Sequence, residues 1–218
     1  MRFDNRSDAG RKLAMQLAAY RTADCVVLAL PRGGVPVGFE VAQALQKPLD
    51  ILVVRKIGMP GQEELALGAM GPQGGVVWNA DLLGCFNLTP QDVQGVVSQE
   101  QAELTRRLAV FRGVRPYPSL RNKTVLLVDD GLATGASVRA ALQSLGSMHP
   151  AKVVLAIPVG AKSTVAQLRP CVDELVCLLE PEELHSVGEW YRDFTQTSDQ
   201  AVISLLQRAW HDEKIREG

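Results

Sequence analysis

The stretch that decides the fold runs from Val125 to Ser137 and reads Val-Leu-Leu-Val-Asp-Asp-Gly-Leu-Ala-Thr-Gly-Ala-Ser. Its apolar segment ends in two acids, Asp129 and Asp130, and a loop of small and hydroxyl residues then leads into a helical pattern. In open α/β sheets, ligands bind at the carboxyl ends of the strands, where such a loop lies. The stretch therefore predicts a buried strand, a ligand-binding loop and a helix.

The start of that helix suits a phosphate group, because free N–H groups and the positive end of the helix dipole attract anions. Gly135 lets the backbone approach closely, since it has no Cβ, and Thr134 and Ser137 add hydroxyl donors. The two acids would repel a phosphate but accept hydrogen bonds from a vicinal diol. Together these groups describe a site for a ribose 5-phosphate. The alternative is a plain strand-to-helix turn whose acids cap the local backbone.

Short apolar runs alternate with helical patterns along the rest of the chain. We expect strands at residues 25–30, 51–54, 75–78, 124–128, 153–159 and 174–179. We expect helices at residues 36–45, 89–112, 137–145 and 200–210. Continuous Val, Leu and Ile runs are typical of a parallel sheet that is covered on both faces. The pattern predicts an α/β fold with a doubly wound, mostly parallel sheet flanked by helices.

The composition favours one globular domain over residues 1–218, because 46% of the residues are hydrophobic and 22% are charged. Lys and Arg total 23 and Asp and Glu total 24, which gives a net charge of -1. This balance argues against a nucleic-acid partner. No apolar run approaches the ~18 residues of a membrane-spanning helix, so we expect no membrane partner. The polar opening does not have the pattern of a signal peptide.

The cysteines and histidines show no metal-binding pattern. None of the cysteines forms a Cys-x-x-Cys pair, and we expect reduced thiols and a cytoplasmic location. The three histidines lack metal-ligand spacing, so we expect no metal site built by the protein. The residues concerned are Cys25, Cys85, Cys171, Cys177, His149, His185 and His211.

The stretch quoted first resembles the signature of the type I phosphoribosyltransferases: four apolar residues, two acids, two variable positions, a small residue or Thr, then Thr-Gly and a small or hydroxyl pair. The resemblance implies a small hood over the sheet. It also implies the ligand 5-phosphoribosyl 1-pyrophosphate (PRPP), with Mg²⁺ held mainly by PRPP itself. Asp129 and Asp130 would be catalytic, because they hold the ribose hydroxyls near the developing positive charge. The 5-phosphate and ribose would also contact Gly131, Ala133, Thr134, Gly135, Ala136 and Ser137.

Two basic segments fit the same ligand. Arg32, Gly33 and Gly34 follow the first strand, where two glycine N–H groups and a guanidinium can face an anion. The family places its pyrophosphate loop after the first core strand, which this segment resembles. Arg55 and Lys56 end the expected second strand, and the resemblance implies pyrophosphate contacts there too. The alternative for this pair is a solvated strand edge.

Residues 58–75 are rich in glycine and resemble the mobile catalytic lid of the family, which closes on hinges. An ordinary surface hairpin is the alternative. Glu63 or Glu64 could supply acid-base help from this lid, and a surface charge is the alternative for each. We expect the hood to come from about residues 1–20 and 181–218.

The acceptor pocket is expected in the hood, and the polar and aromatic tail supplies the candidates. Its aromatic rings could stack on a planar base, whereas packing of the tail onto the core is the alternative. The candidates are Trp190, Tyr191, Arg192, Asp193, Phe194 and Gln196. Ala133 stands where members acting on 6-oxopurines carry an Asp, and its loop looks like that of adenine-type members.

The resemblance implies a phosphoribosyltransferase, a glycosyltransferase of nucleotide metabolism. Such an enzyme transfers the 5-phosphoribosyl group from PRPP to a nitrogen acceptor, for example a nucleobase, with release of pyrophosphate. The alternative is a regulatory protein that binds PRPP and catalyses nothing. Paired subunits are common in the family, which leaves a homodimer open.

Overall fold

The computed structural model describes residues 2–72 and 74–217, without the side chains of Glu63, Glu64 and Glu217. The chain divides into two compact units. The first consists of Met1–Ile51, Pro118–Gly135 and His149–Gly218, and the second of Leu52–Tyr117 and Ala136–Met148.

A five-stranded parallel sheet forms the centre of the first unit, with the order β2-β1-β6-β7-β8. Its strands are β1 (Cys25–Ala29), β2 (Leu49–Ile51), β6 (Thr124–Val128), β7 (Lys152–Val159) and β8 (Glu174–Leu179). Every residue of β1 is buried, as are the last four residues of β6. This burial explains the uninterrupted apolar runs and confirms the predicted α/β fold with a parallel sheet.

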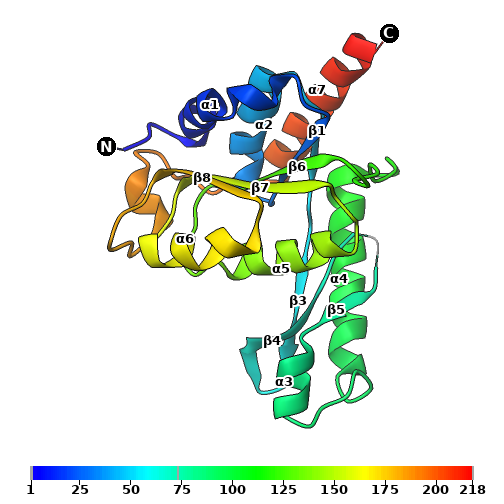
Figure 1. Ribbon diagram of the computed structural model, residues 1–218. Helices are drawn as coiled ribbons and strands as arrows, with labels where there is room; N and C mark the ends of the chain where they lie inside the picture. The colour runs from blue at the N-terminus through cyan, green and yellow to red at the C-terminus, as the bar shows by residue number, and fades with distance from the viewer. Residues whose placement is uncertain (1, 73, 218) are drawn as a thin grey trace. The chain divides into compact units, whose positions relative to one another are not determined.

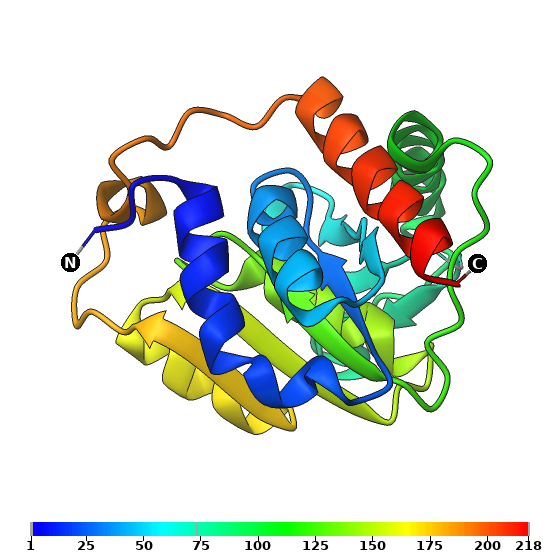
Figure 2. The same ribbon diagram turned by 90° about the horizontal axis from the view of Figure 1, so that it is seen from above.

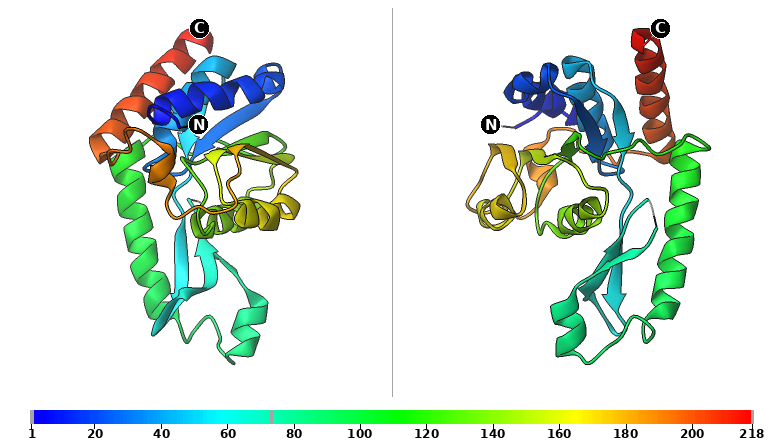
Figure 3. Two further views of the ribbon diagram at one scale, coloured as in Figure 1. Left: turned by 90° about the vertical axis from the view of Figure 1, so that its left-hand side faces the viewer. Right: turned by 45° about the vertical axis from the view of Figure 1, so that its right-hand side comes forward.

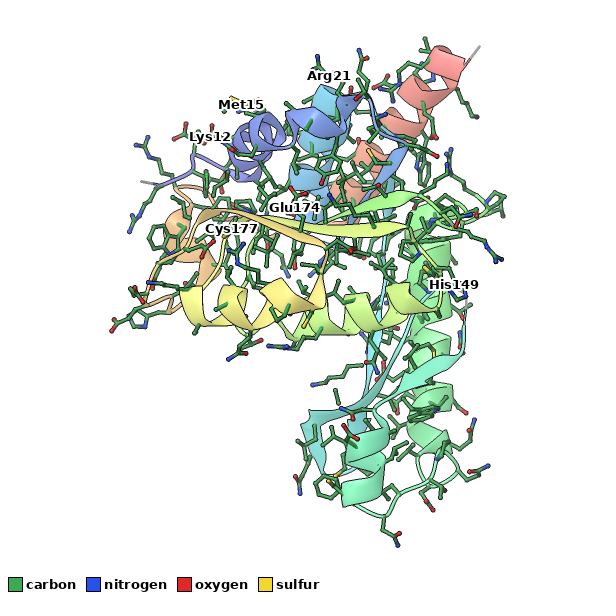
Figure 4. All side chains as sticks on the ribbon, viewed as in Figure 1. Lys12, Met15, Arg21, His149, Glu174 and Cys177 are labelled. Atoms are coloured by element: carbon green, nitrogen blue, oxygen red, sulfur yellow. The ribbon has the colours of Figure 1, made fainter. Side chains whose placement is uncertain are left out.

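Helices cover both faces of this sheet (Figures 1 and 2). One face carries α1 (Arg6–Gln16), α2 (Gly34–Leu45) and α7 (Asp199–Glu217), and the other carries α6 (Lys162–Leu168). Gly38 lets α2 lie close to β1, because a Cβ at this position would come within 2.9 Å of the Ala29 Cβ. Met15, which is 68% exposed, lies on the outer side of α1 (Figure 4).

The second unit contains a three-stranded antiparallel sheet with the order β3-β4-β5. Its elements are β3 (Arg55–Met59), β4 (Gln62–Met70), β5 (Val76–Trp78), α3 (Ala80–Cys85), α4 (Gln94–Arg112) and α5 (Ala136–Gly146). The β3–β4 hairpin runs alongside α4 (Figure 3). Leu67, Leu83 and Val93 form a small buried cluster of this unit.

Two strand predictions were wrong in position or partner. The strand expected at residues 51–54 is β2, which begins at Leu49 and ends at Ile51, and Arg55 and Lys56 begin β3 instead of ending β2. Sequence analysis missed the start of β2 because its middle residue, Asp50, is polar and interrupts the apolar run. Asp50 is nevertheless buried, and its carboxylate accepts a hydrogen bond from the Ile51 N–H. The strand expected at residues 75–78 pairs with β4 in the antiparallel sheet. A short apolar run does not reveal its partner.

The helix expected from Thr89 begins later, at Gln94. Asp92 Oδ2 accepts hydrogen bonds from the Thr89 N–H and hydroxyl, each at 2.7 Å, so these capping residues form a separate turn. The other expected helices are confirmed as α2, α5 and α7, and α7 continues to Glu217. The helices α1, α3 and α6 were not predicted.

Residues 58–72 and 74–75 contain the end of β3, the hairpin turn and β4, and their glycines include two kinds. Gly61, Gly74 and Gly75 have positive φ angles of 73–78°, and a Cβ added to them would meet at most one atom within 4 Å, so these glycines serve backbone conformation and not close packing. A Cβ on Gly71 would lie 1.7 Å from Ser144 Oγ, so this glycine serves close packing. Lid closure stays a prediction. The proposed acid-base role of Glu63 or Glu64 falls on side chains outside the described part.

The two segments expected to form the hood lie side by side in the first unit. Phe3 and Tyr191 form a parallel bridge, the Phe3 N–H donates to the Trp190 carbonyl at 2.8 Å, and the Arg192 N–H donates to the Phe3 carbonyl at 2.9 Å. Their role as a hood stays a prediction. Among the described residues, no helix is both long and apolar enough to cross a membrane.

Candidate functional site

The two acids of the signature lie directly after β6, at the carboxyl end of the parallel sheet. Asp130 Oδ2 accepts a hydrogen bond from Arg6 Nε at 2.8 Å, and the two side chains are only 16% and 10% exposed. The Asp130 N–H donates to Asp129 Oδ1 at 2.9 Å. The acids therefore form one cluster with a guanidinium from α1.

Burial and the neighbouring Asp130 charge raise the pKa of the Asp129 carboxyl well above its ordinary value, while the Arg6 charge acts in the opposite direction. Burial, followed by the Asp130 charge, likewise raises the pKa of the Tyr191 hydroxyl. Two neighbouring carboxylates in a buried site are stabilised by cations or by hydrogen-bond donors. The cluster is thus suited to a ligand that brings hydroxyl groups.

The Arg32-Gly33-Gly34 loop lies against the two acids within the same unit. A Cβ on Gly33 would come within 2.0 Å of Asp130 Oδ2, and one on Gly34 within 2.8 Å of the Val128 carbonyl oxygen. Glycine is therefore needed at both positions for the loop to approach the end of β6. The Pro31–Arg32 peptide bond is cis. Arg32 Nη1 lies 3.3 Å from Asp199 Oδ1 at an exposed position.

The loop that follows the acids is fixed by its backbone and exposes its side chains. The Leu132 N–H donates to the Val159 carbonyl at 2.9 Å, and the Thr164 hydroxyl donates to the Ala133 carbonyl at 2.7 Å. Gly135 has a φ of +77°, and a Cβ there would lie 3.0 Å from Thr164 Cγ2. Ala133 and Thr134 are exposed. The loop therefore has a set backbone conformation and an accessible surface.

Between Gly135 and Ala136 the chain passes into the second unit, which contains a pocket of its own. The pocket has a volume of about 540 Å³ and brings Arg55 and Lys56 together with Ala136 and Ser137 at the start of α5. The other lining residues are Val54, Gly58, Met59, Pro60, Val96, Gln99, Glu100 and Ala140. Two basic side chains and a helix N-terminus in one pocket favour an anion.

Glu100 of α4 is a pocket residue that sequence analysis missed. Its Oε2 accepts a hydrogen bond from Arg55 Nε at 2.5 Å, and the side chains are 18% and 26% exposed. Nothing in the surrounding helical pattern distinguishes Glu100 from the other acids of this helix. Arg55 is thus held by an internal carboxylate.

The tail residues predicted for the acceptor pocket have different environments. Tyr191 is 4% exposed, its hydroxyl donates to the Asp130 carbonyl at 2.5 Å, and its ring lies 5.4 Å from that of Phe3 and 5.0 Å from that of Phe194. Tyr191 therefore packs into the core while contacting the acid loop.

The remaining tail candidates lie nearer the surface. Arg192 pairs with Asp4 at 3.1 Å, and Asp193 Oδ1 accepts hydrogen bonds from the N–H and hydroxyl of Thr195. Trp190 is half-buried and Gln196 is exposed. Their assignment to an acceptor pocket stays a prediction.

Arg6 is a residue in direct contact with Asp130 that sequence analysis did not single out. It is 124 residues from Asp130 in the chain, and no local pattern marks it. Among the described residues, no group of three or more His, Cys, Asp or Glu side chains is arranged to hold a metal ion.

A family profile described as "Phosphoribosyl transferase domain" matches residues 3–189. The chain belongs to the phosphoribosyl transferase family. The "Putative phosphoribosyl transferase" of Mycobacterium tuberculosis strain H37Rv is 48% identical to this phosphoribosyl transferase domain over 210 residues. The match covers 96% of this chain and 47% of that protein, so the chain spans about half the length of the curated relatives it matches.

Solved structures share the fold of this domain. The crystal structure of TT1426 from Thermus thermophilus is similar to this domain with a TM-score of 0.87 and 39% identity, over 95% of this chain and 99% of that one. AQ2163 from Aquifex aeolicus, at 15% identity and a TM-score of 0.50, covers 84% of this chain and 78% of its own and shares the fold.

Proposed function

We propose that this domain transfers the 5-phosphoribosyl group from PRPP to a nitrogen acceptor and releases pyrophosphate. The observation that carries the proposal is the partly buried pair Asp129 and Asp130, with Gly33 packed against Asp130 at a distance that admits no side chain. Family membership supplies the phosphoribosyl ligand class. The acceptor and the chemical step are part of the proposal.

The acids, the glycine loop and the loop after the acids each have a role in this reaction. Asp129 and Asp130 accept hydrogen bonds from the ribose hydroxyls and stabilise the positive charge that grows on the ring in an oxocarbenium-like transition state. The N–H groups of Gly33 and Gly34, with Arg32, face the leaving pyrophosphate. Gly131 and residues 133–137 hold the 5-phosphate, for which the exposed loop and the helix start are suited.

In the second unit, Arg55 and Lys56 supply the positive charge of an anion pocket. Arg55 donates to Glu100 through Nε, and its guanidinium has further N–H donors with which a phosphate oxygen can form hydrogen bonds. Arginine binds both groups through the same planar fork of donors. We therefore assign Arg55 and Lys56 to pyrophosphate binding.

Magnesium fits this site as an ion carried by the ligand. Asp130 Oδ2 is already held by Arg6 and Asp129 Oδ1 by a backbone N–H, so the acids are engaged as hydrogen-bond acceptors. Mg²⁺ commonly binds through substrate phosphates and water. When bound, it would neutralise charge on the departing pyrophosphate. The protein residues orient the sugar around it.

We propose PRPP and a small nitrogen compound as partners, with a second copy of the chain as a further candidate. Ala133 is exposed and carries no group that could take a proton from a 6-oxopurine, which favours other acceptors. We also propose a cytoplasmic setting, because Cys25, Cys85, Cys171 and Cys177 are free thiols.

A melting-temperature titration with PRPP, with and without Mg²⁺, tests ligand binding first. At ~100 times its dissociation constant, PRPP would stabilise the folded state by about 2.7 kcal/mol. For a chain of this size, that corresponds to a rise of roughly 5–10 °C. The double variant Asp129→Asn/Asp130→Asn should lose the rise and remain folded, whereas Asp24→Asn, at an exposed position, should keep it.

Pyrophosphate release then separates an enzyme from a regulator. Release that requires both PRPP and one compound from an acceptor panel supports transfer. PRPP binding without release for any acceptor would support the regulatory alternative. No thermal response to PRPP by the folded protein would refute the proposed ligand.

A further inference from the structure

Arg6 is an arginine with only 8% of its surface exposed, at the first turn of α1. Burial of a guanidinium costs free energy unless its donors are paired. Arg6 Nε donates to Asp130 Oδ2 at 2.8 Å and Arg6 Nη1 donates to the Thr195 carbonyl at 2.8 Å. The two donors therefore reach two segments that are far apart in the chain.

A third contact completes this arrangement. The guanidinium carbon of Arg6 lies 3.8 Å from the centre of the Phe194 ring, a distance typical of a cation–π contact. Phe194 packs against Tyr191, and the Tyr191 hydroxyl donates to the Asp130 carbonyl. Both the side chain and the backbone of Asp130 are thus tied to the tail between residues 191 and 195.

We propose that Arg6 is a positioning residue for phosphoribosyl transfer, which holds the Asp130 carboxylate in the orientation that receives the ribose hydroxyls and couples it to the tail. This inference rests on the proposed function. Gly33 leaves no room on one side of Asp130 Oδ2, and Arg6 holds the same oxygen. The carboxylate is confined by two different segments, so its orientation is set before a ligand arrives.

The geometry requires an arginine and not only a positive charge. Arg6 uses two nitrogens of a rigid planar group to reach Asp130 and Thr195 at once, while its face lies on Phe194. A lysine ammonium is a compact charge on a flexible stem and does not reproduce this fork. Lysine at position 6 should therefore preserve charge and lose orientation.

Other charged groups face this guanidinium. Asp129 adjoins Asp130, the Tyr191 hydroxyl lies at the Asp130 carbonyl, and Asp193 also interacts electrostatically with Arg6. Removal of Arg6 leaves these groups without their shared cation. The pH below which PRPP binding is lost should consequently move upward in a variant without this charge, because the Arg6 charge lowers the pKa of the neighbouring Asp129 carboxyl.

The test is a double-mutant cycle on PRPP affinity, measured by calorimetry in the presence of Mg²⁺. Arg6→Gln should weaken PRPP binding by about tenfold or more, the scale of one hydrogen bond to a charged group. Arg6→Lys should give an intermediate loss and retain the wild-type pH profile. In the Asp130→Asn background, Arg6→Gln should cause little further loss, because Arg6 acts through Asp130.

Arg11→Gln is the matched control on the same helix. Arg11 is 58% exposed and lies 3.5 Å from Glu40, so its replacement should leave PRPP affinity and its pH profile unchanged. Wild-type PRPP affinity in folded Arg6→Gln would overturn the inference. So would an Arg6→Gln substitution that weakens PRPP binding equally in the wild-type protein and in the Asp130→Asn variant. If Arg6→Gln does not fold, full wild-type affinity in Arg6→Lys would overturn it instead. Absence of PRPP binding in the wild type would refute the proposed function and this inference with it.

Discussion

Gly33→Ala should weaken PRPP binding by displacing the Asp130 carboxylate while the protein remains folded. Gly33 has φ and ψ angles of -62° and -33°, which alanine adopts without strain. The added methyl would instead lie 2.0 Å from Asp130 Oδ2 and 2.6 Å from Asp130 Cγ. The carboxylate must move by about 1 Å or more to reach an ordinary contact distance.

That displacement breaks the Arg6–Asp130 hydrogen bond, whose length is 2.8 Å. A hydrogen bond to a charged group contributes about 1.5–3 kcal/mol to folding stability. Replacing glycine by alanine at an unstrained position stabilises the folded protein by about 0.4–1 kcal/mol, because it lowers the conformational entropy of the unfolded chain. The net loss of unfolding free energy is then about 0.5–2.6 kcal/mol, or a fall of roughly 1–10 °C in melting temperature. PRPP affinity should fall by at least about tenfold, because the displaced acid no longer meets the ribose hydroxyls.

The assay pairs a melting curve with a PRPP titration for three glycine variants. Gly84→Ala is the control, because nothing lies within 4 Å of the added Cβ. Gly34→Ala places its Cβ 2.8 Å from the Val128 carbonyl oxygen, so it should destabilise the backbone and lower the melting temperature further. Wild-type PRPP affinity in Gly33→Ala, or an equal loss in Gly84→Ala, would refute the placement of the ribose at Asp130.

Three further outcomes test the acids and their loop. Asp129 has a raised pKa in the folded state, so its contribution to stability is complete below the ordinary pKa of ~3.9 and is lost as pH rises through the folded value. Asp129→Asn should therefore melt higher than the wild type at pH 7 and still lose the PRPP-induced shift; a lower melting temperature would contradict this. Gly135→Ala should cost about 1–2 kcal/mol at a φ of +77° and weaken PRPP binding, because its Cβ would lie 3.0 Å from Thr164 Cγ2 and shift the loop, as thermal titration would show. Thr164→Val removes the donor to the Ala133 carbonyl, which should cost about 1 kcal/mol and raise the dissociation constant for PRPP in calorimetry.

The core strands and the acid loop were predictable because their signals are local. In β1, β6 and β7 the apolar runs coincide with buried strand residues, and residues 124–128 match β6 at both ends. Glycine at position 135 follows from the backbone conformation of a single turn. Apolar runs and turn glycines depend only on residues that are adjacent in the chain, so they can be recognised in the sequence.

Other features had no local signal. The glycines of residues 58–75 look alike in the sequence but serve two different purposes. Gly68 and Gly71 allow close packing against β5 and α5. Positive φ angles are found instead at Gly61, Gly74 and Gly75. Packing glycines are identified only by the atoms that a Cβ would meet. The tail was equally ambiguous, because Tyr191 packs in the core and contacts the acid loop at the same time.

The sequence by itself determined the fold class and marked Asp129, Asp130 and the loop after them as the candidate site, because the apolar runs and the loop residues that signal them are contiguous in the chain. The tertiary structure alone decided which groups surround those acids. Arg6 meets Asp130 across 124 residues, and Arg55 meets Glu100 across 45. Such pairs form only when the folded chain brings distant segments within about 3 Å, the distance at which a charged hydrogen bond acts.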